Sequence, residues 1–212
     1  MKTGMQAEAR LSQGLEQLGL SVDAHRQEKL MLYLRLMLKW NRTYNLTAIR
    51  ELDEMVIRHL LDSLSIMAYI ECSRVLDVGS GAGLPGVPLA ICMPDCQFVL
   101  LDSNGKKTRF LRQTKIELAI ENIDIIHSRI EDYKPSSGFE VITCRAFAAL
   151  NTILDRTEHL VTSTTRIMAM KAKEDLSVLT EGFEQRAQHR LQVPWLNEER
   201  HLLEITPSEM KL

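Results

Sequence analysis

The stretch Val75-Leu76-Asp77-Val78-Gly79-Ser80-Gly81-Ala82-Gly83-Leu84-Pro85-Gly86 decides the fold. A short apolar run ends in four glycines within eight residues, and an apolar helical pattern follows. Glycine permits positive φ and lets a ligand approach the backbone closely. Pro85 suits the first turn of a helix, where its missing N–H is not needed. The stretch therefore predicts a strand, a ligand-cradling turn and a helix, at the edge of a parallel sheet where ligands bind.

Beyond this stretch, β-branched runs alternate with amphipathic segments. Strands are predicted at 74–78, 98–102, 123–127, 141–144 and 166–171, and helices at about 85–92, 105–120, 149–160 and 174–188. This alternation predicts an α/β fold with a mostly parallel, seven-stranded sheet and helices on both faces. Two late segments, 190–195 and 201–206, have no helix between them and are predicted to form an antiparallel hairpin at one edge.

The segment before residue 71 has a different texture and is predicted to be helical throughout. Leu11, Leu15 and Leu18 recur at helical spacing, and Gly19 ends that pattern. Ser21 and Asp53 are the predicted caps of the next two helices. The sequence thus divides into a helical N-terminal extension over residues 1–70 and a ligand-binding domain over residues 71–212.

Composition excludes several classes of protein. The 212 residues are 45% hydrophobic, and 26 basic against 28 acidic side chains give a net charge of −2. This composition is typical of a folded globular chain rather than a disordered one. We find neither a secretory signal nor an apolar run of membrane-spanning length, so we expect a cytoplasmic protein without a membrane partner. No obligate protein partner is evident, and any site for a polyanion must be a local patch.

The four cysteines do not indicate a metal site. Cys72, Cys92, Cys96 and Cys144 form no CxxC pair, and no histidine lies at zinc-ligand spacing from them. We expect reduced, mostly buried thiols and no metal.

The glycine pattern distinguishes between two kinds of nucleotide-like cofactor. A GxGxxG dinucleotide fingerprint fits only from Gly81, two residues too late in the turn, because the frame that starts at Gly79 has Leu84 in place of the third glycine. The better fit is Asp77-x-Gly79-x-Gly81-x-Gly83, which resembles the first motif of the Rossmann-like, class I S-adenosylmethionine methyltransferases. The fold class and a predicted S-adenosyl-L-methionine cofactor follow from this resemblance.

Asp102 is the second candidate cofactor residue. It ends the second predicted strand, 23 residues after Gly79. A carboxylate at that point accepts hydrogen bonds from ribose hydroxyls in either cofactor family. The alternative is that Asp102 only caps the helix that follows.

A basic ridge follows Asp102. Lys106, Arg109, Arg112 and Lys115 step by three along the helix predicted next to the cofactor turn. Such a ridge contacts nucleic-acid phosphates without reading their sequence. The alternative is an ordinary solvated helix face.

Six ordered motifs together resemble the ribosomal RNA small-subunit methyltransferase G family, also called glucose-inhibited division protein B. They are Asn45-Leu46-Thr47, Arg58-His59-Leu60-Leu61-Asp62-Ser63, the glycine loop, Leu101-Asp102-Ser103 with its basic helix, Arg145-Ala146-Phe147 and Arg200-His201-Leu202. The resemblance covers residues 10–206 and implies a bacterial cytoplasmic enzyme. That family methylates N7 of guanine 527 in 16S rRNA with S-adenosylmethionine, and the 30S subunit is the expected setting.

The resemblance also implies roles for individual residues. Gly79 and Leu84 would line the methionine and adenosine end of the cofactor, and Ile130 and Glu131 would flank its adenine. Arg145 would contact the cofactor, since a guanidinium pairs with a carboxylate or with a phosphate.

Two further positions bear on the RNA. Lys171 and Arg200 are candidate RNA contacts, together with Lys106, Arg109 and Arg112. Two residues depart from the family pattern: Cys144 replaces a usual Ser before the Arg-Ala-Phe run, and Ala172 replaces a usual Gly after Lys171. If that glycine adopts a positive φ, Ala172 strains the loop.

The implied reaction assigns no catalytic acid or base. Guanine N7 carries an in-plane lone pair and no proton at neutral pH, so in-line attack on a methyl group requires only positioning. Trp40, Tyr44 and Phe147 are candidates for stacking on bases, with core packing as the alternative.

Three other functions stay open from the residues alone. One is an NAD-dependent oxidoreductase that uses Gly81, Gly83 and Gly86. The others are a small-molecule methyltransferase and a non-enzymatic ribosome-associated factor with the same fold.

Overall fold

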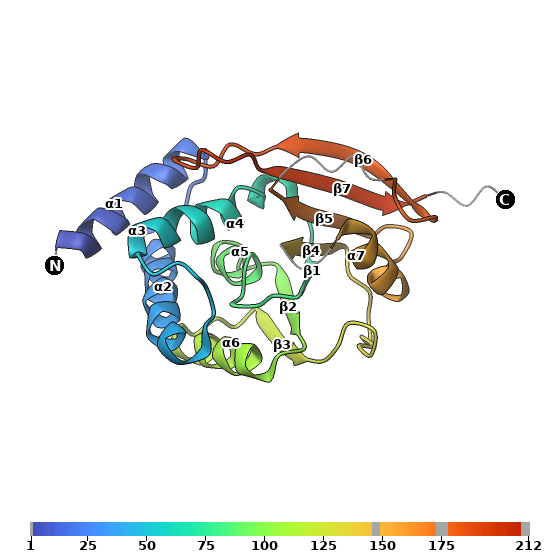
Figure 1. The fold of residues 1–212 in the computed structure, drawn as a ribbon, viewed down its shortest axis with the longest axis horizontal. Coiled ribbons are helices and arrows are strands. Elements are labelled where there is room, and N and C mark those ends of the chain that lie inside the picture. Colours follow the sequence, from blue (N-terminus) through green and yellow to red (C-terminus); the bar gives the residue numbers. More distant parts are fainter. Residues whose placement is uncertain (1, 146–148, 173–177, 209–212) are drawn as a thin grey trace.

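A computed structural model describes residues 2–145, 149–172 and 178–208, with side chains from Met5 onward (Figure 1). The chain begins with the helices α1 (Lys2–Gln17) and α2 (Ala24–Tyr44). A second helical stretch comprises α3 (Leu52–Met55), a π-helical turn (Val56–Leu61), α4 (Asp62–Leu64) and a 3₁₀ turn (Met67–Tyr69). No helix in these described ranges combines the length and apolar character needed to cross a membrane.

Among the described residues from Arg74 onward, seven strands form one sheet. Its strands are β1 (Arg74–Val78), β2 (Gln97–Asp102), β3 (Ile123–His127), β4 (Val141–Arg145), β5 (Arg166–Lys171), β6 (Phe183–Arg190) and β7 (His201–Pro207). The strand order is β3-β2-β1-β4-β5-β7-β6, with β7 antiparallel to both of its neighbours and the other pairs parallel. The predicted fold class, a mostly parallel seven-stranded sheet, is confirmed.

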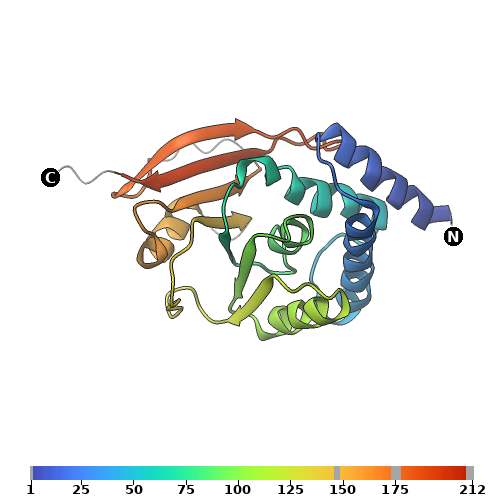
Figure 2. The ribbon, with the colours of Figure 1, turned by 180° about the vertical axis from the view of Figure 1, so that it is seen from behind.

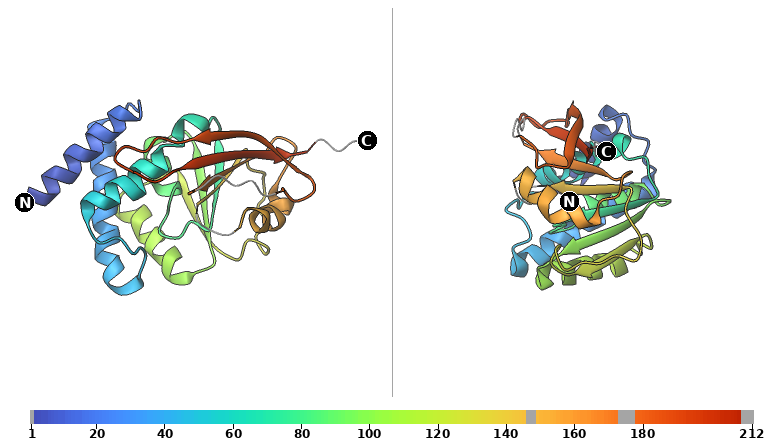
Figure 3. Two further views of the ribbon diagram at one scale, coloured as in Figure 1. Left: turned by 45° about the horizontal axis from the view of Figure 1, so that its top comes forward. Right: turned by 90° about the vertical axis from the view of Figure 1, so that its right-hand side faces the viewer.

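Both faces of the sheet are covered. Side chains alternate between the two faces along each strand, so each strand contributes apolar residues to both sides. On one face Val75, Phe98 and Val141 join the cluster that contains the N-terminal helices, α5 (Gly86–Cys92) and α6 (Gly105–Glu117). On the other face Leu76 and Ile142 join α7 (Leu150–Thr157) and the 3₁₀ turn Glu158–Leu160. Figures 2 and 3 show the sheet between these two helical layers. The apolar strands are buried on both sides, as parallel sheets require.

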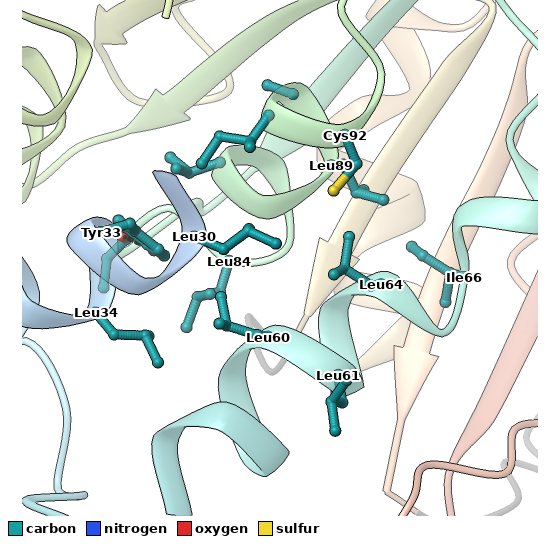
Figure 4. Close-up of a cluster of buried hydrophobic side chains, with 14 of the residues drawn as sticks. Leu30, Tyr33, Leu34, Leu60, Leu61, Leu64, Ile66, Leu84, Leu89 and Cys92 are labelled. Atoms are coloured by element: carbon teal, nitrogen blue, oxygen red, sulfur yellow. Dashed lines mark hydrogen bonds between the residues drawn. The ribbon is translucent and has the colours of Figure 1, made fainter. Parts of the chain in front are cut away.

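The N-terminal helices share a core with the sheet. Side chains of α2, of the 56–64 helical stretch and of α5 meet in one cluster (Figure 4). Leu30, Tyr33, Leu60 and Leu64 are each fully buried there. The helices before residue 70 and the sheet after it are held by the same apolar contacts. The division of the chain at this residue stays a prediction.

All four cysteines are free thiols, and three of them are buried as expected. Cys72 is the partly exposed one, and its Sγ lies 3.8 Å from the Sγ of Cys96.

The predicted helix at 174–188 is wrong in its second half. Residues 173–177 lie outside the described ranges, and Phe183–Arg190 form β6, the edge strand of the sheet. The segment is rich in Glu, Gln, Arg and Ala, which favour helices when no partner is near. Here β7 supplies a partner, and charged side chains are what an exposed edge strand needs. The predicted antiparallel hairpin is therefore present, but its first strand ends at Arg190 instead of starting there.

Both predicted helix caps are also wrong. Asp23, not Ser21, is the N-cap of α2, and its side chain accepts a hydrogen bond from the Arg26 N–H at 2.8 Å. Asp53 lies inside the first turn of α3, whose N-cap is Glu51. At the start of α2 the choice was ambiguous, since both Ser21 and Asp23 are residue types that favour caps. At α3 the N-cap Glu51 makes no side-chain cap hydrogen bond, so no cap residue marked that start.

The last glycine of the decisive stretch is needed for packing. Gly86 begins α5 directly over β1 and β2, and a Cβ added there would lie 2.3 Å from Leu100 Cδ2 and 2.7 Å from Asp77 Oδ2. No other residue lets the helix pack this closely on the strands.

We predict that Gly86→Ala lowers the free energy of unfolding by about 3 kcal/mol, because the added methyl overpacks a closed core. Gly19→Ala is the matched control: Gly19 has φ +69°, but a Cβ added there would meet no heavy atom within 4 Å, so the cost is about 1 kcal/mol of backbone strain. Urea unfolding of both variants measures the difference. Equal costs would show that Gly86 is not a packing glycine.

Candidate functional site

The glycine loop is the starting point of the site. Gly79, Gly81 and Gly83 all adopt positive φ, at 66°, 61° and 96°. Backbone N–H groups of Gly79 and Ser80 both donate to the carbonyl of Leu101, at 2.9 and 3.1 Å. The loop thus folds back over the ends of β1 and β2, in the conformation that only glycines adopt without strain.

Asp77 lies beneath this loop and organises it. Its side chain is fully buried, and Oδ2 accepts a hydrogen bond from the Gly86 N–H at 3.1 Å while Oδ1 accepts one from the Thr143 hydroxyl at 3.3 Å. Burial raises the pKa of this carboxyl to about 6, against the lowering effect of its hydrogen bonds. The structure therefore places Asp77 as a support for the turn, covered from solvent.

Asp102 holds the loop from the other side. Its Oδ2 accepts the Gly81 N–H at 2.8 Å, and its Oδ1 accepts the Asn104 N–H at 2.7 Å. The cap interpretation is wrong, because Asn104 is the N-cap of α6 and accepts the Lys106 N–H at 2.9 Å. Lys107 Nζ lies 4.0 Å from Asp102 Oδ2, so a cation faces this carboxylate.

A first cavity of about 210 Å³ opens over the ends of β1, β2 and β3. It brings together four of the predicted cofactor residues, Gly79, Asp102, Ile130 and Glu131. Glu131 is exposed at its rim and forms an ion pair with Arg156 at 3.2 Å. The side chain of Leu84 instead packs into the apolar cluster (Figure 4).

A second cavity of about 340 Å³ lies over the ends of β4 and β5. Arg145, predicted as a cofactor contact, lines this cavity instead of the first one, together with Lys171 and Arg200. Cys144 and Ala172, the two departures from the family pattern, also line it. The cavities lie over neighbouring strands, because Val78 of β1 lines the first and its sheet partner Cys144 of β4 lines the second.

The basic ridge on α6 is partly as predicted. Lys106, Arg109 and Arg112 are exposed, and none of them has an ion-pair partner among the described residues. Lys115 is turned away, because its Nζ binds the carbonyl of Ile123 and lies 3.5 Å from Asp124. Three cations, rather than four, are therefore presented beside the first cavity.

The stacking candidates are partly explained by packing. Trp40 stacks on Tyr44 with ring centroids 5.1 Å apart and tilts against the buried Phe110 at 5.7 Å. Packing on α6 therefore accounts for the position of Trp40. Phe147 lies outside the described residues.

Two hydrogen-bonded connections to the N-terminal helices were not predicted. The buried Tyr33 hydroxyl of α2 donates to the Ala82 carbonyl of the glycine loop at 2.6 Å. The Asn41 side chain donates a hydrogen bond to the Thr47 carbonyl and accepts one from the Thr47 N–H. The Thr47 hydroxyl lies 2.9 Å from His59 Nε2. A polar residue on an apolar helix stripe was the available signal in each case.

Sequence reasoning also missed Asp62 and Glu198. Asp62 is buried and contacts both Arg145 and Arg200, while Glu198 contacts Arg58 and Arg200. A charge in the apolar helix 56–64 hinted at Asp62, but Glu198 stands among other acidic residues and carried no signal.

The order of strands, the glycine loop and the paired cavities define a Rossmann-like methyltransferase fold. Among solved structures, magnesium protoporphyrin IX methyltransferase from Synechocystis PCC 6803 with bound S-adenosylmethionine matches with a TM-score of 0.56 at 14% identity, covering 89% of this chain and 99% of that one. A protein of the NADB-Rossmann superfamily from Streptococcus agalactiae matches with a TM-score of 0.56 at 15% identity, over 71% and 69% of the two chains. These likenesses show the fold.

Sequence comparison identifies the family. Residues 26–203 match the family described as rRNA small subunit methyltransferase G. Ribosomal RNA small subunit methyltransferase G of Pseudomonas aeruginosa (strain LESB58) is 51% identical over 91% of this chain and 92% of its own length. That of Nitrosococcus oceani is 48% identical over 93% and 94%. The chain belongs to the rRNA small subunit methyltransferase G family, as the six motifs predicted.

The oxidoreductase interpretation is thereby excluded. Its third glycine, Gly86, packs on Asp77 and Leu100, which accounts for that glycine without a dinucleotide.

We predict that His59 makes the protein sensitive to mild acid. Burial lowers the pKa of this imidazole to about 4, from an ordinary 6.5. In the unfolded chain the imidazole is protonated below about pH 6.5, whereas in the folded chain it stays neutral down to about pH 4. The free energy of unfolding therefore decreases as pH falls from about 6.5 to about 4.

Comparison with His59→Gln isolates this group. The difference in unfolding free energy between parent and variant should shrink by about 2 kcal/mol between about pH 7.5 and pH 5, because only the parent carries the imidazole. Urea unfolding across that range measures it. A difference that does not change with pH would contradict the lowered pKa.

Proposed function

We propose that this chain transfers the methyl group of S-adenosylmethionine to N7 of guanine 527 in 16S rRNA, and that the substrate is the small ribosomal subunit (30S) in the cytoplasm. The observation that carries the proposal is the match of residues 26–203 to the rRNA small subunit methyltransferase G family. The two cavities over neighbouring strands support it, since the reaction requires a donor and an acceptor close together.

The first cavity is our proposed cofactor site. Asp102 would accept the ribose hydroxyls, with Lys107 nearby to balance its charge. Ile130 would cover the adenine ring, and Glu131 would accept its amino group. The loop residues Gly79, Gly81, Gly83 and Leu84 would shape the methionine end, and Asp77 would hold that loop from below.

When bound, S-adenosylmethionine supplies an electrophilic methyl group on its sulfonium. The chain need not remove a proton from guanine N7, because that nitrogen has a free lone pair. Its own contribution is to hold donor and acceptor in line, an effect worth up to about 7–11 kcal/mol in well-oriented reactions. This is why we assign no general acid or base.

The exposed cations of α6 are the proposed RNA-binding face. Lys106, Arg109 and Arg112 lie on the helix that begins just after Asp102, so the backbone they bind would pass the mouth of the cofactor cavity. Lys171, Arg200 and Arg145 line the second cavity, where a target nucleotide would be received.

We expect labelled methyl from S-adenosylmethionine to appear at N7 of guanine 527 when the protein is incubated with 30S particles that lack the modification. Mapping the labelled nucleotide checks this directly. Absence of label, with cofactor binding shown by calorimetry, would refute the proposed substrate. Absence of both label and binding would refute the proposed methyltransferase.

We expect Arg109→Gln to weaken binding to 30S particles and to lower the salt dependence of that binding. Each lost phosphate contact reduces the slope of log K against log salt by about one. Arg186→Gln is the control, because Arg186 is equally charged and exposed but lies on the edge strand β6. Equal effects of the two variants would show that α6 is not the RNA-binding face.

A further inference from the structure

A buried carboxylate lies between two arginines on the wall of the second cavity. Asp62 Oδ2 accepts a hydrogen bond from Arg145 Nη1 at 2.7 Å, and Asp62 Oδ1 accepts one from Arg200 Nε at 3.0 Å. The Asp62 side chain is 5% exposed, against 19% for Arg145 and 15% for Arg200. All three residues line the cavity.

The three residues come from separate parts of the fold. Asp62 belongs to α4, Arg145 ends β4, and Arg200 immediately precedes β7. Arg145 Nη1 also donates to the carbonyl of Arg58 at 3.0 Å, so the helical stretch 56–64 holds it twice. The acceptor side of the site is therefore built partly by the N-terminal helices.

Alternating charges extend this arrangement along the rim. Arg200 Nη2 donates to Glu198 at 3.1 Å, and the two Glu198 oxygens accept from Arg58 at 3.0 and 2.6 Å. Arg58 Nε in turn donates to Glu54 at 3.0 Å. Three guanidinium groups and three carboxylates thus alternate, and each guanidinium is fixed by a charge-assisted bond.

Fixing the arginines has a consequence for the ligand. Two guanidiniums at one wall repel each other unless a carboxylate lies between them. A guanidinium has five N–H donors, so Arg145 and Arg200 keep donors for a further acceptor after binding Asp62. Guanine offers O6 as an acceptor beside the reacting N7, whose lone pair must stay free to attack the methyl group, and its nucleotide carries a phosphate.

We propose that Asp62 is a positioning residue for the methyl acceptor: it holds Arg145 and Arg200 on the cavity wall so that their remaining donors orient a guanine nucleotide toward the cofactor cavity. This inference rests on the proposed function and names the site of its acceptor. In this proposal Asp62 acts through the two arginines and need not touch the substrate or the reacting atoms.

The test is Asp62→Asn, which keeps the shape but places an amide N–H₂ against a guanidinium. We expect kcat/KM with 30S particles to fall about 100-fold, the cost of misplacing a reactant by about 1 Å, with the dissociation constant for S-adenosylmethionine changed less than about twofold. Asp62→Glu should recover part of the loss, because it restores the charge.

Glu204→Gln is the matched control. Glu204 has a side chain that is 12% exposed and contacts Arg166 at 3.6 Å, but it does not line the cavity. It should leave kcat/KM near the parent value. Parent-like kcat/KM in Asp62→Asn, or a parallel loss of cofactor binding, would overturn the proposal.

A binding measurement separates this proposal from the proposed function. Guanosine 5′-monophosphate titrated into labelled protein should shift the NMR signals of Cys144 and Lys171, and Asp62→Asn should weaken this binding about tenfold. An inactive parent that still binds the nucleotide in this way would refute the RNA substrate and support the acceptor site. No shift at these residues in the parent would overturn the acceptor site itself.

Discussion

The hydrogen bond from the Gly86 N–H to the buried Asp77 carboxylate is the constraint on which the site depends. It fixes the start of α5 over β1, and the absence of a side chain at Gly86 lets the helix approach. The loop between them then has to rise over the strand ends, where Asp102 holds Gly81 and the first cavity forms. The carboxylate is costly to bury: its raised pKa means that this group contributes most to stability below about pH 3.8, and that the contribution is lost as pH rises through about 6. The pH dependence of this contribution is opposite to that of His59, whose contribution to stability is lost as pH falls. A structural acid that opposes stability at neutral pH is retained because the loop requires it.

The helices before β1 complete the site as well as the core. Tyr33 ties α2 to the glycine loop, and Asp62 ties α4 to Arg145 and Arg200. The helical stretch 56–64 departs from regular α-helix into a π-helical turn, and π turns are frequent where side chains must be aimed at a functional site. Here the turn ends at Leu61, so Asp62 begins the next helix directly beside the cavity. The same apolar contacts that hold these helices on the sheet therefore also set the geometry of the acceptor wall.

The sequence predicted those features of the fold that neighbouring residues determine. The parallel strands, the glycine loop and the position of Asp102 followed from β-branched runs, positive-φ requirements and the end of a strand. The edge strand β6 did not follow, because its Glu, Gln and Arg favour a helix until β7 pairs with it. The wall of the second cavity could not be predicted either, because Arg200 lies 138 residues from Asp62 along the chain. Only the completed sheet brings the two residues together. For the same reason the sequence alone did not show that β4 places Arg145 in the second cavity, next to Lys171 and Arg200.

The net charge of −2 conceals two kinds of cation that act over different ranges. Lys106, Arg109 and Arg112 are exposed and unpartnered among the described residues, so their field reaches outward and salt screens it within about 8–10 Å. Arg145 and Arg200 are largely buried and already bound to Asp62, so they attract little at a distance. What they offer is fixed geometry at contact, which salt affects much less. In our proposal, attraction to RNA and alignment of the base therefore rest on different residues: the exposed cations of α6 for the first, and the two arginines held by Asp62 for the second.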